Sequence, residues 1–341
     1  MGEHDVVLIP GDGIGPEVAR AVQCILGAAG APLRWHEHAA GLAALEQGLD
    51  VLPATTVDAI RAAGVALKGP CTTPVGGGFG SVNVRLRKTL DLHAALRPVR
   101  NLAGVRSRYT DIDLVVVREN TEGLYSGVEN EITPGVVTSL KVATERACER
   151  IARFALHYAE SRGRNRVTIF HKANIMKLTD GLFLRTAHRV HDAEFPDIEL
   201  DALIIDAGCM KLVQDPSRFD VLLMENLYGD VVSDLCAGLV GGLGVVPGAN
   251  FGEDCAVFEA VHGSAPDLAG QDRANPLALL MSAVMLLNHL AEVRADASCH
   301  VVAARIRAAY DRALAEGQTT ADIGGRLGTQ AFAEAVVSRL G

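Results

Sequence analysis

The chain has 341 residues, 49% of them hydrophobic, so it can bury a large core and would divide into two lobes. Its 32 Lys and Arg residues against 41 Asp and Glu give a net charge of −9 without any basic run, which argues against a nucleic-acid partner. No apolar run is long enough to cross a membrane and the start lacks a secretory signal, so we expect a cytoplasmic protein without a membrane partner. The seven scattered cysteines, never spaced as Cys-x-x-Cys, indicate buried free thiols rather than disulfides or zinc.

Short apolar runs alternate with longer helical stretches, which is the pattern of an α/β protein. The expected strands are 6–10, 65–69, 113–119, 166–172, 219–225 and 255–261. The expected helices are 18–26, 144–161, 178–193, 276–291 and 298–315. The best candidates for crossovers between lobes are 96–104 and 238–252, and if both are crossovers, the first and last thirds of the chain share one lobe.

Three glycines in the string PGDGIGPE, Gly11, Gly13 and Gly15, follow the first expected strand and precede a helix. Their spacing is Gly-x-Gly-x-Gly, which differs from the Gly-x-Gly-x-x-Gly fingerprint of dinucleotide-binding Rossmann folds. We therefore expect a tight glycine turn in which Pro16 opens the helix, where its missing N–H costs nothing.

The segment 72–97 is the first to suggest ligand binding. Its triple glycine, Gly76 to Gly78, would let the backbone approach a ligand closely. A helix beginning near Ser81 would point its N-terminus, and hence its free N–H groups, at that ligand. An anion is the natural occupant of such a site.

Arginines in and after this segment favour an anionic ligand with several carboxylates. Arg85 and Arg87 lie two apart and so on different helix faces. Arg97 lies in an extended stretch and Arg118 near the end of an expected strand. Several guanidinium groups in one pocket would suit a polycarboxylate, because each can pair with a carboxylate through two hydrogen bonds. Taken singly, each of these arginines is more often a surface ion pair.

Three aspartates form the second group of candidate site residues. Asp230 and Asp234 are four residues apart, so on a helix both carboxylates would project from one face and repel each other. A divalent cation would remove that repulsion, and ligands that are all oxygen indicate Mg²⁺ or Mn²⁺ rather than zinc. Asp206, at the end of the run LDALIID, would complete the site from a separate element. A solvated acidic helix face is the alternative for the pair alone.

A metal ion beside clustered arginines would serve the oxidation of a 2-hydroxy acid followed by loss of a neighbouring carboxylate as CO₂. Such a reaction needs a base for the hydroxyl proton and an acid for the enol. Tyr125 in RENTEGLYSG and Lys172 in FHKAN are the candidates, since both can transfer protons when nearby cations or burial lower their pKa values.

Six blocks of sequence carry a resemblance to a known family. They are GDGIGPE, TTPVGGGFGSVNVRLRKTLDL, RENTEGLYSG, HKANIMKLTDGLF, NLYGDVVSDLCAGLVGGLG and HGSAPDLAGQDRANP. In this order and spacing the chain resembles, along nearly its whole length, the isocitrate/isopropylmalate dehydrogenases, and among them most closely the NAD-dependent isocitrate dehydrogenases. The resemblance implies an NAD- and metal-dependent decarboxylating enzyme.

The resemblance also implies a role for each candidate residue. Ser81 and Asn83, with Thr73, stand where isocitrate enzymes contact the distal carboxylate. The other two carboxylates would be held by Arg87, Arg97 and Arg118. Tyr125 and Lys172 match the proton-transfer pair, to which Asp206 adds a catalytic contribution, while the metal-binding aspartates are matched by Asp206, Asp230 and Asp234.

The cofactor implied by the resemblance is NAD. Adenosine would lie on the loop HGSAPDLAGQDRAN, in which Asp267 can accept hydrogen bonds from the ribose hydroxyls and would repel a 2′-phosphate. By this resemblance, family members that use NADP carry Lys followed by Tyr at the positions where this chain has Asp267 and Leu268. Further residues expected to line the site are Ile14, Thr73, Glu259, His262, Gly263, Ser264, Ala265 and Asn275. Without the resemblance, Asp267 reads as an ordinary loop aspartate.

The family fold implied is two α/β lobes around a central cleft rather than a Rossmann fold. Residues 1–98 and 242–341 would form the large lobe, and 99–241 the small one. Family members are homodimers or dimer-based oligomers with shared active sites, in which Lys172 and Asp206 reach the site from the second subunit. The arm exchanged between subunits would correspond to about 125–145.

The substituent on the substrate is the least determined feature. Ser81 and Asn83 favour the short polar arm of isocitrate over the apolar one of 3-isopropylmalate. Departures from the family pattern at Phe79-Gly80, Ala94-Ala95 and Glu225 leave homoisocitrate or a phosphonomethyl analogue of malate as alternatives. A regulatory subunit without activity is a further alternative, against which the full set of metal and proton-transfer residues argues.

Overall fold

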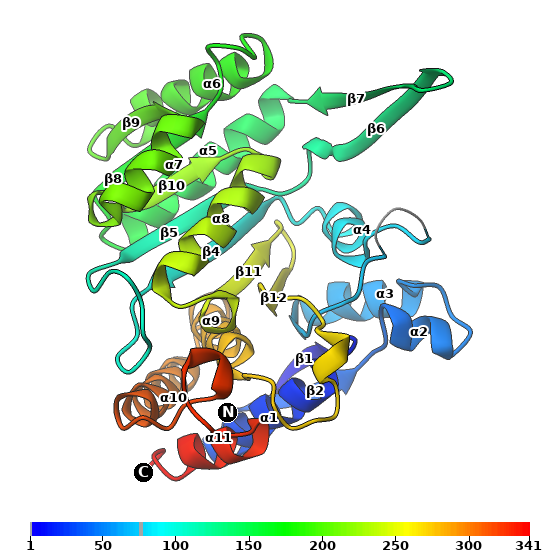
Figure 1. Cartoon of the computed structure of the whole chain (residues 1–341), viewed down its shortest axis with the longest axis vertical. Coiled ribbons are helices and arrows are strands. Elements are labelled where there is room, and N and C mark those ends of the chain that lie inside the picture. The colour runs from blue at the N-terminus through cyan, green and yellow to red at the C-terminus, as the bar shows by residue number, and fades with distance from the viewer. Residues whose placement is uncertain (1, 75–77) are drawn as a thin grey trace.

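A mixed β-sheet runs through the whole molecule in the computed structural model, which describes residues 2–74 and 78–341 (Figure 1). Within these residues the sheet has ten strands. In spatial order they are β2 (Leu33–Glu37), β1 (His4–Ile9), β3 (Val65–Lys68), β12 (Ala256–Ala260), β11 (Pro247–Phe251), β4 (Ala94–Arg100), β5 (Asp113–Glu119), β10 (Val221–Met224), β8 (Arg166–His171) and β9 (Glu199–Ile204).

The centre of the sheet is antiparallel and its two ends are parallel. β11 pairs antiparallel with β12 and with β4, and β4 pairs antiparallel with β5. The remaining pairs are parallel, as expected for strands separated by helices. The strand order and the antiparallel centre differ from those of a Rossmann fold, which confirms the predicted fold class.

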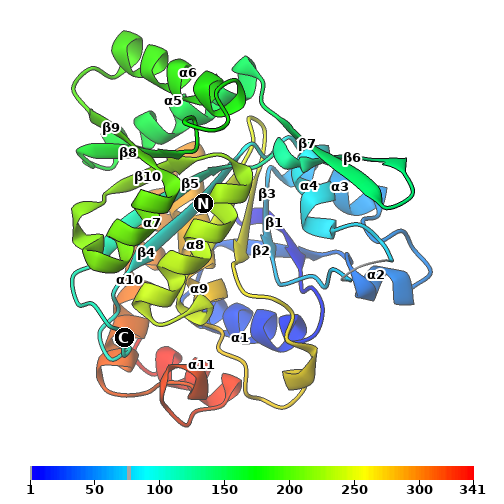
Figure 2. The ribbon, with the colours of Figure 1, turned by 45° about the horizontal axis from the view of Figure 1, so that its top comes forward.

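Helices cover both faces of the sheet (Figures 1 and 2). Among the described residues they are α1 (Gly15–Ala28), α2 (Leu42–Glu46), α3 (Ala54–Ala63), α4 (Val82–Thr89), α5 (Glu145–Ser161), α6 (Thr179–Glu194), α7 (Ile205–Gln214), α8 (Asn226–Val240), α9 (Leu277–Val293), α10 (Ala297–Ala315) and α11 (Thr329–Val337). Successive side chains of a strand point to opposite faces of the sheet, so each strand contributes to two parts of the core. On β5, Val115 and Val117 pack with α5 and α6, whereas Val116 packs with α8. None of these helices has the length and apolar character needed to cross a membrane.

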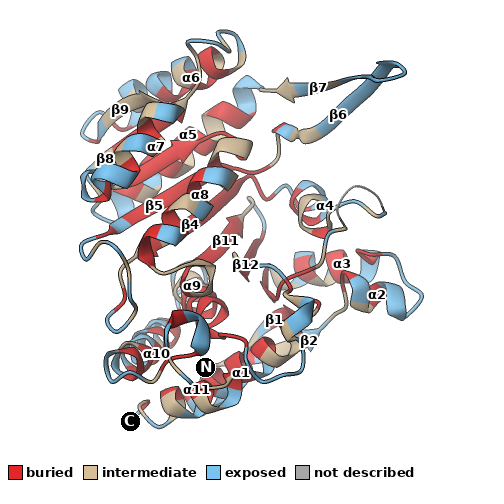
Figure 3. Ribbon diagram, in the orientation of Figure 1, coloured by how far each residue is buried: buried red, intermediate tan, exposed pale blue. Residues whose placement is uncertain are grey.

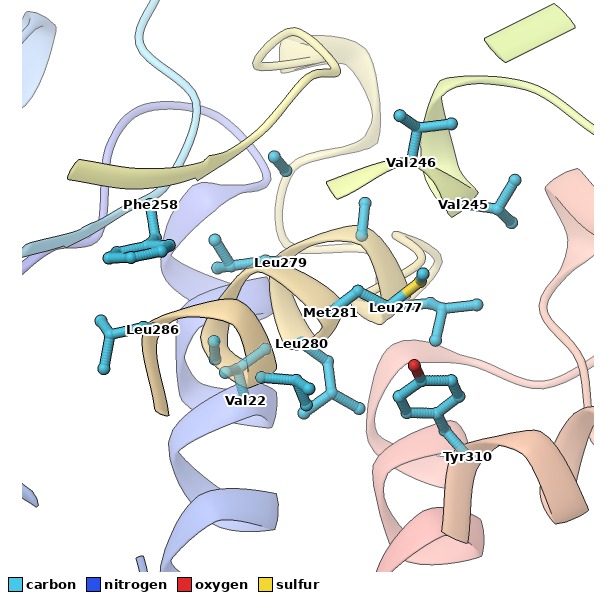
Figure 4. Close-up of a cluster of buried hydrophobic side chains, with 14 of the residues drawn as sticks. Val22, Val245, Val246, Phe258, Leu277, Leu279, Leu280, Met281, Leu286 and Tyr310 are labelled. Atoms are coloured by element: carbon cyan, nitrogen blue, oxygen red, sulfur yellow. The ribbon is translucent and has the colours of Figure 1, made fainter. Parts of the chain in front are cut away.

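Helix α9 lies at the centre of the largest hydrophobic cluster (Figure 4). It is apolar on nearly all sides because it is enclosed by the sheet, α1 and α10, with Leu277, Leu280 and Leu287 fully buried. Figure 3 shows that burial follows the sheet and its flanking helices. A second cluster lies under α5 and α6, and a third under α3 and α4.

The structure confirms the predicted elements to within a few residues and adds strands that the sequence did not indicate, among them β2, β9 and β11. The glycine turn is also confirmed: Gly11 and Gly13 have positive φ angles, and Pro16 stands in the first turn of α1. Any side chain at Gly13 would come within 2.1 Å of the Ser264 carbonyl oxygen, so the turn requires glycine. Gly76 and Gly77 of the predicted anion loop lie outside the described residues.

A hairpin of β6 (Gly123–Thr133) and β7 (Val136–Val142) projects away from the upper half of the molecule in Figure 1. Its position and length correspond to the predicted arm at about 125–145. The strand order groups β1, β2, β3 and β12 at one end of the sheet and β5, β8, β9 and β10 at the other. We propose on this basis that the two lobes are 1–98 with 242–341, and 99–241.

Candidate active site

A cleft of about 220 Å³, here called the front cleft, opens between the two ends of the sheet. Strands from both ends contribute to its walls, and α4 and α8 flank it. Its lining residues are Lys68, Pro70, Cys71, Ser81, Asn83, Val84, Arg87, Ala95, Arg97, Arg118, Tyr125, Asp230, Gly248, Ala249, Asn250, Glu259, Ala260, Val261, His262 and Gly263.

Three buried arginines point into the front cleft. Arg118 lies opposite Ala95 in the β4–β5 ladder, so its side chain shares a face with that of Arg97, two residues along β4. Arg87 reaches the same space from the last turn of α4. Each is at most 8% exposed, which is rare for arginine unless its charge has a partner. Arg85, by contrast, is exposed and pairs with Asp50 on the surface.

Helix α8 supplies the carboxylates that face these arginines. Asp230 accepts from Arg118 and also lies 3.7 Å from Arg97, whereas Asp234, one turn later, lies 3.4 Å from Arg97. Burial alone would raise the pKa of Asp230, but Arg118, Tyr125 and Arg97 hold it below its ordinary value. The pKa of Asp234 is raised by burial and, in part, by the neighbouring Asp230 charge.

The side chain of Tyr125, near the start of β6, contacts both Asp230 and Arg118. Its hydroxyl donates to Asp230 Oδ2 at 2.6 Å, and the Arg118 guanidinium lies 5.0 Å from the centroid of its ring. Burial, followed by the Asp230 carboxylate, raises the pKa of the Tyr125 hydroxyl. The hydroxyl is therefore protonated at neutral pH and available as an acid in the cleft.

Three buried polar atoms that line the front cleft lack hydrogen-bond partners within the described structure. They are Asn83 Oδ1, Arg87 Nε and His262 Nε2. An unpaired buried polar atom costs free energy, so each would gain from a polar ligand. Their convergence on one cleft indicates that the cleft is built to hold such a ligand.

The N-terminus of α4 closes one side of the cleft. Ser81 is its N-cap and accepts from the backbone N–H of Val84, while Thr73 Oγ1 lies 3.3 Å from Ser81 Oγ. The free N–H groups of this helix end add to the positive potential of the arginines.

The predicted cofactor loop packs directly on the glycine turn. Ile14 donates its backbone N–H to the Ser264 carbonyl at 2.9 Å, and the hydroxyls of Thr72 and Ser264 lie 2.7 Å apart. Asp267 lies in a short 3₁₀ turn, Pro266–Leu268, with its side chain exposed. Further along, Asn275 is buried and donates to Asp322 at 3.0 Å.

A buried ion cluster at the back of the front cleft was missed by the sequence analysis. We call it the Glu259 cluster; it comprises Lys68, Arg87, Asn250 and Glu259. Glu259 accepts from Lys68 at 2.7 Å, Arg87 at 3.0 Å and Asn250 at 2.8 Å. Burial would raise the pKa of Glu259, but the two cations hold it well below its ordinary value. The available signal was a lysine inside the otherwise apolar run VALKG.

Lys172 and Asp206 lie together but away from the other candidates. Lys172 Nζ is 2.5 Å from Asp206 Oδ1, and this pair is partly exposed. Among the described residues that line the front cleft, neither is found. One chain thus brings together the arginines, Tyr125 and Asp230, but leaves Asp206 apart from Asp230 and Asp234.

A second ion cluster joins β7 of the hairpin to α6 and to the start of α8. It comprises Lys141, Asp180 and Glu225 and is here called the Lys141 cluster. Lys141, near the end of β7, donates to both carboxylates and lies 4.6 Å from the centroid of the Tyr228 ring. Burial raises the pKa of Glu225 to about 7 although Lys141 opposes the shift. Asp180 also accepts from the backbone N–H of Lys172 at 2.7 Å, so this cluster orders the Lys172 loop.

The described residues contain one group of three side chains close enough to share a metal ion, namely His4, Asp296 and Cys299. It lies outside the front cleft, and Asp296 in it caps α10. The three aspartates of the candidate metal site, Asp206, Asp230 and Asp234, therefore do not come together within a single chain.

The sequence as a whole matches the isocitrate/isopropylmalate dehydrogenase family over residues 5–336. The chain belongs to this family. The match covers both ends of the sheet and all the candidate residues, so the predicted resemblance is confirmed.

Relatives within the isocitrate/isopropylmalate dehydrogenase family include NAD isocitrate dehydrogenase subunits. The chain is 48% identical to the mitochondrial catalytic subunit 5 of Arabidopsis thaliana, with 98% of this chain and 87% of the relative covered. It is 47% identical to the human mitochondrial alpha subunit, with 99% and 91% covered. The crystal structure of isocitrate dehydrogenase from Methylococcus capsulatus superposes with a TM-score of 0.93 at 46% identity, covering 99% of each chain.

These names correct one prediction. We expected a cytoplasmic protein, but the relatives from plant, fly, worm and human are named as mitochondrial, so that expectation is wrong. It rested on missing membrane spans and a missing secretory signal. Proteins of the cytosol and of the mitochondrial matrix share both features, which therefore do not separate the two compartments.

Proposed function

We propose that the chain catalyses the metal-dependent oxidative decarboxylation of isocitrate to 2-oxoglutarate, with NAD as hydride acceptor. The observation that carries the proposal is the meeting of three buried guanidinium groups with Asp230 in one cleft. Buried cations in such number need anionic partners, and a tricarboxylate supplies them. The names of the relatives support the same reaction and cofactor.

The arginines would bind two of the substrate carboxylates, and the unpaired atoms would complete the fit. Arg97 and Arg118 flank Asp230, and Arg87 approaches from α4. Asn83 and the N-cap Ser81 would contact the distal carboxylate, with Thr73 beside them. This polar corner favours isocitrate over 3-isopropylmalate, whose apolar arm would leave these groups unpaired.

The donor set fits a hard divalent cation. Asp230 and Asp234 present carboxylate oxygens one helical turn apart. Burial and, to a smaller extent, repulsion by Asp230 raise the pKa of Asp234, and a divalent cation would favour the charged form of both carboxylates. Asp206 of a second copy of the chain would be the third ligand. When bound, Mg²⁺ or Mn²⁺ would polarise the newly formed carbonyl for loss of CO₂.

Proton transfer would be divided between two side chains. The protonated Tyr125 hydroxyl, held by Asp230, stands where an acid for the enol is needed. Lys172 of a second copy would act on the substrate hydroxyl together with Asp206, with which it is paired in each chain.

NAD would bind along the loop that packs on the glycine turn. Ser264 bonds to Ile14 through its carbonyl oxygen and to Thr72, the neighbour of Thr73, through its hydroxyl. Gly263 and Ala265 flank Ser264, and His262 and Glu259 face the front cleft. Asp267 is free to accept from the ribose hydroxyls, with Asn275 at the end of the loop. Replacing Asp267 with Lys should shift preference from NAD toward NADP, and an unchanged ratio of kcat/KM values would contradict this assignment.

In a dimer with shared active sites, Lys172 and Asp206 of one chain would reach the front cleft of the other. The hairpin exposes a row of large apolar side chains, namely Leu124, Val128, Ile132, Val136, Val137 and Leu140. Ile175 and Leu178, on the Lys172 loop, are exposed as well. Exposed apolar surface of this extent is typical of a subunit interface. The alpha and catalytic-subunit names of the relatives also describe subunits of larger assemblies.

Mixing two inactive variants tests the shared site. In hybrids of Lys172→Met with Tyr125→Phe, one site of each dimer would have both residues intact. We expect about a quarter of the original activity after random reassembly, since half of the dimers are hybrids with one working site. If mixing restores nothing while hybrids form, the site is built within one chain.

The reaction itself is tested by NADH formation. Purified protein with Mn²⁺ should reduce NAD fastest with isocitrate, compared with homoisocitrate, 3-isopropylmalate and a phosphonomethyl analogue of malate. A higher kcat/KM for another member of the panel would overturn the substrate. No NADH from any member would favour a regulatory subunit that binds ligand without turnover.

A further inference from the structure

A second and larger cleft lies behind the sheet. It has a volume of about 570 Å³, within the range of pockets that hold small molecules, and we call it the rear cleft. Its floor is the reverse face of the strands that floor the front cleft. On β4, Ala95 and Arg97 face forward, whereas Leu96, Pro98 and Arg100 face the rear. The two clefts are therefore separate, with β4 and β11 as their common wall.

The interior of the rear cleft is apolar and rich in aromatic rings. Phe154 of α5, Phe251 of β11 and His289 of α9 pack in a chain, with ring centroids 5.4 Å and 5.7 Å apart. Tyr158 lines the same wall as Phe154, and Met285 of α9 faces it from the opposite side. A flat apolar body would make offset-stacked or edge contacts with these rings.

The rim of the rear cleft is positively charged. Four arginines line it against two acidic residues, Asp113 and Glu292. Arg100 bonds to Tyr310 and Asp311, Arg164 to Asp113 and Asp220, and Arg162 of α5 to Glu292 of α9 at 2.5 Å. Acidic side chains therefore neutralise three of the four arginines.

Arg307 of α10 is the fourth arginine of the rim, and its side chain is exposed to solvent. Across residues 2–74 and 78–341 it forms neither a hydrogen bond nor an ion pair, although it lies close enough to influence the Tyr310 hydroxyl. His157 and His300 stand on the same rim. An apolar interior beside an uncompensated guanidinium is complementary to a molecule that is flat and apolar at one end and anionic at the other.

We propose that the rear cleft is a binding site for a small aromatic anion, such as an aromatic carboxylate or sulfonate, distinct from the site of the reaction. The apolar body would occupy the space between α5 and α9, and the anionic group would pair with Arg307. Neither half of the ligand is sufficient: a bare inorganic anion leaves the interior empty, and a neutral ring leaves Arg307 unpaired.

The probe for the test is 1-anilinonaphthalene-8-sulfonate, whose fluorescence rises in apolar surroundings. Arg307→Glu should weaken its binding by about tenfold or more, because a charge-assisted hydrogen bond becomes a repulsion. Asn288→Trp, on the α9 wall, should block it by filling the cleft. The matched control is Arg20→Glu, an exposed charge reversal on α1 outside the cleft, which should leave the affinity unchanged. Circular dichroism establishes that each variant is folded.

Competition experiments test whether both the apolar body and the anionic group of the ligand are needed. They also test whether the probe binds in the rear cleft rather than the front cleft. Naphthalene-2-sulfonate should displace the probe, whereas sulfate at equal ionic strength should not. Saturation with isocitrate and Mn²⁺ should leave the Arg307-dependent fluorescence in place. The proposal is overturned if Arg307→Glu and Arg20→Glu bind the probe equally, which would assign the signal to the exposed hairpin, or if isocitrate removes the Arg307-dependent part.

Discussion

The two buried ion clusters both pair cationic side chains with carboxylates, but in opposite proportions. In the Glu259 cluster one carboxylate lies between two cations, Lys68 and Arg87. In the Lys141 cluster one ammonium lies between two carboxylates, Asp180 and Glu225. The pKa of Glu259 is accordingly held well below its ordinary value, whereas burial raises that of Glu225 to about 7. In surroundings of low dielectric constant, the sign of the excess charge decides which groups stay ionised.

The comparison also separates two functions. The excess positive charge of the Glu259 cluster faces the front cleft, where an acidic substrate would neutralise it. The excess negative charge of the Lys141 cluster lies at the base of the hairpin and can be neutralised by a proton. We therefore expect a bound ligand to affect the first cluster and a change of pH to affect the second.

The largest loss in the free energy of unfolding is expected from Glu259→Gln. It leaves Lys68, which is 1% exposed, without a charged partner, and removal of one member of a buried pair costs about 3–5 kcal/mol. Urea unfolding measures the change in the free energy of unfolding, with Glu253→Gln, an exposed residue of the β11–β12 loop, as control. A loss no larger than that of the control would show that Lys68 needs no counterion.

Lys141→Met should cost less, about 1–3 kcal/mol near neutral pH, because Glu225 can take up a proton when the ammonium is lost. Exposed Lys177→Met is the matched control. The same unfolding measurement applies to both. A loss equal to that of Glu259→Gln would contradict the difference we draw between the clusters.

Glu225→Gln should change the pH dependence of stability. The pKa of Glu225 in the folded chain, about 7, lies above its ordinary 4.5, so the folded state binds the extra proton between these values. The resulting stabilisation is complete below about pH 4.5, amounts to ~2–4 kcal/mol, and is lost as the pH rises through 7. The free energy of unfolding of the variant should lack this decline with pH. Parallel plots of this free energy against pH for variant and parent would contradict the raised pKa of Glu225.

The smallest effect on stability is expected from Lys172→Met. Its partner Asp206 is exposed, and an exposed ion pair contributes little to folding. The variant should unfold like the parent and still bind Mn²⁺, yet lose NADH formation if the proposed role is right. Retained turnover would remove Lys172 from the mechanism, whereas a marked loss of stability would place it with the buried clusters.

Much of the fold could be predicted because its signals are local. Apolar runs predicted β1, β5 and β8, and the glycine turn and the Ser81 N-cap each depend on a few adjacent residues. Arg97 and Arg118 could be proposed as neighbours from their positions on strands. The pairing of Asp230 with Arg118 and Tyr125 then followed from the fold.

The sequence could not indicate the ion clusters, because their members are distant along the chain. Glu259 meets Arg87 across 172 residues, and Lys141 meets Glu225 across 84. The apolar run around Lys68 could indicate a buried lysine but not its partner, and Glu225 differed from the family pattern without indicating a contact. Short strands such as β11 were missed for a similar reason, since their pairing partners rather than their composition define them.

Two side chains near the base of the hairpin bind residues of the candidate site or of the Lys141 cluster. Tyr125 near the start of β6 holds Asp230, and Lys141 near the end of β7 holds Asp180 and Glu225. Both contacts lie at the ends of the same hairpin, so they share one mobile or fixed support. We expect a molecule bound at the tip of the hairpin to influence both Tyr125 and, through Asp180, the loop of Lys172.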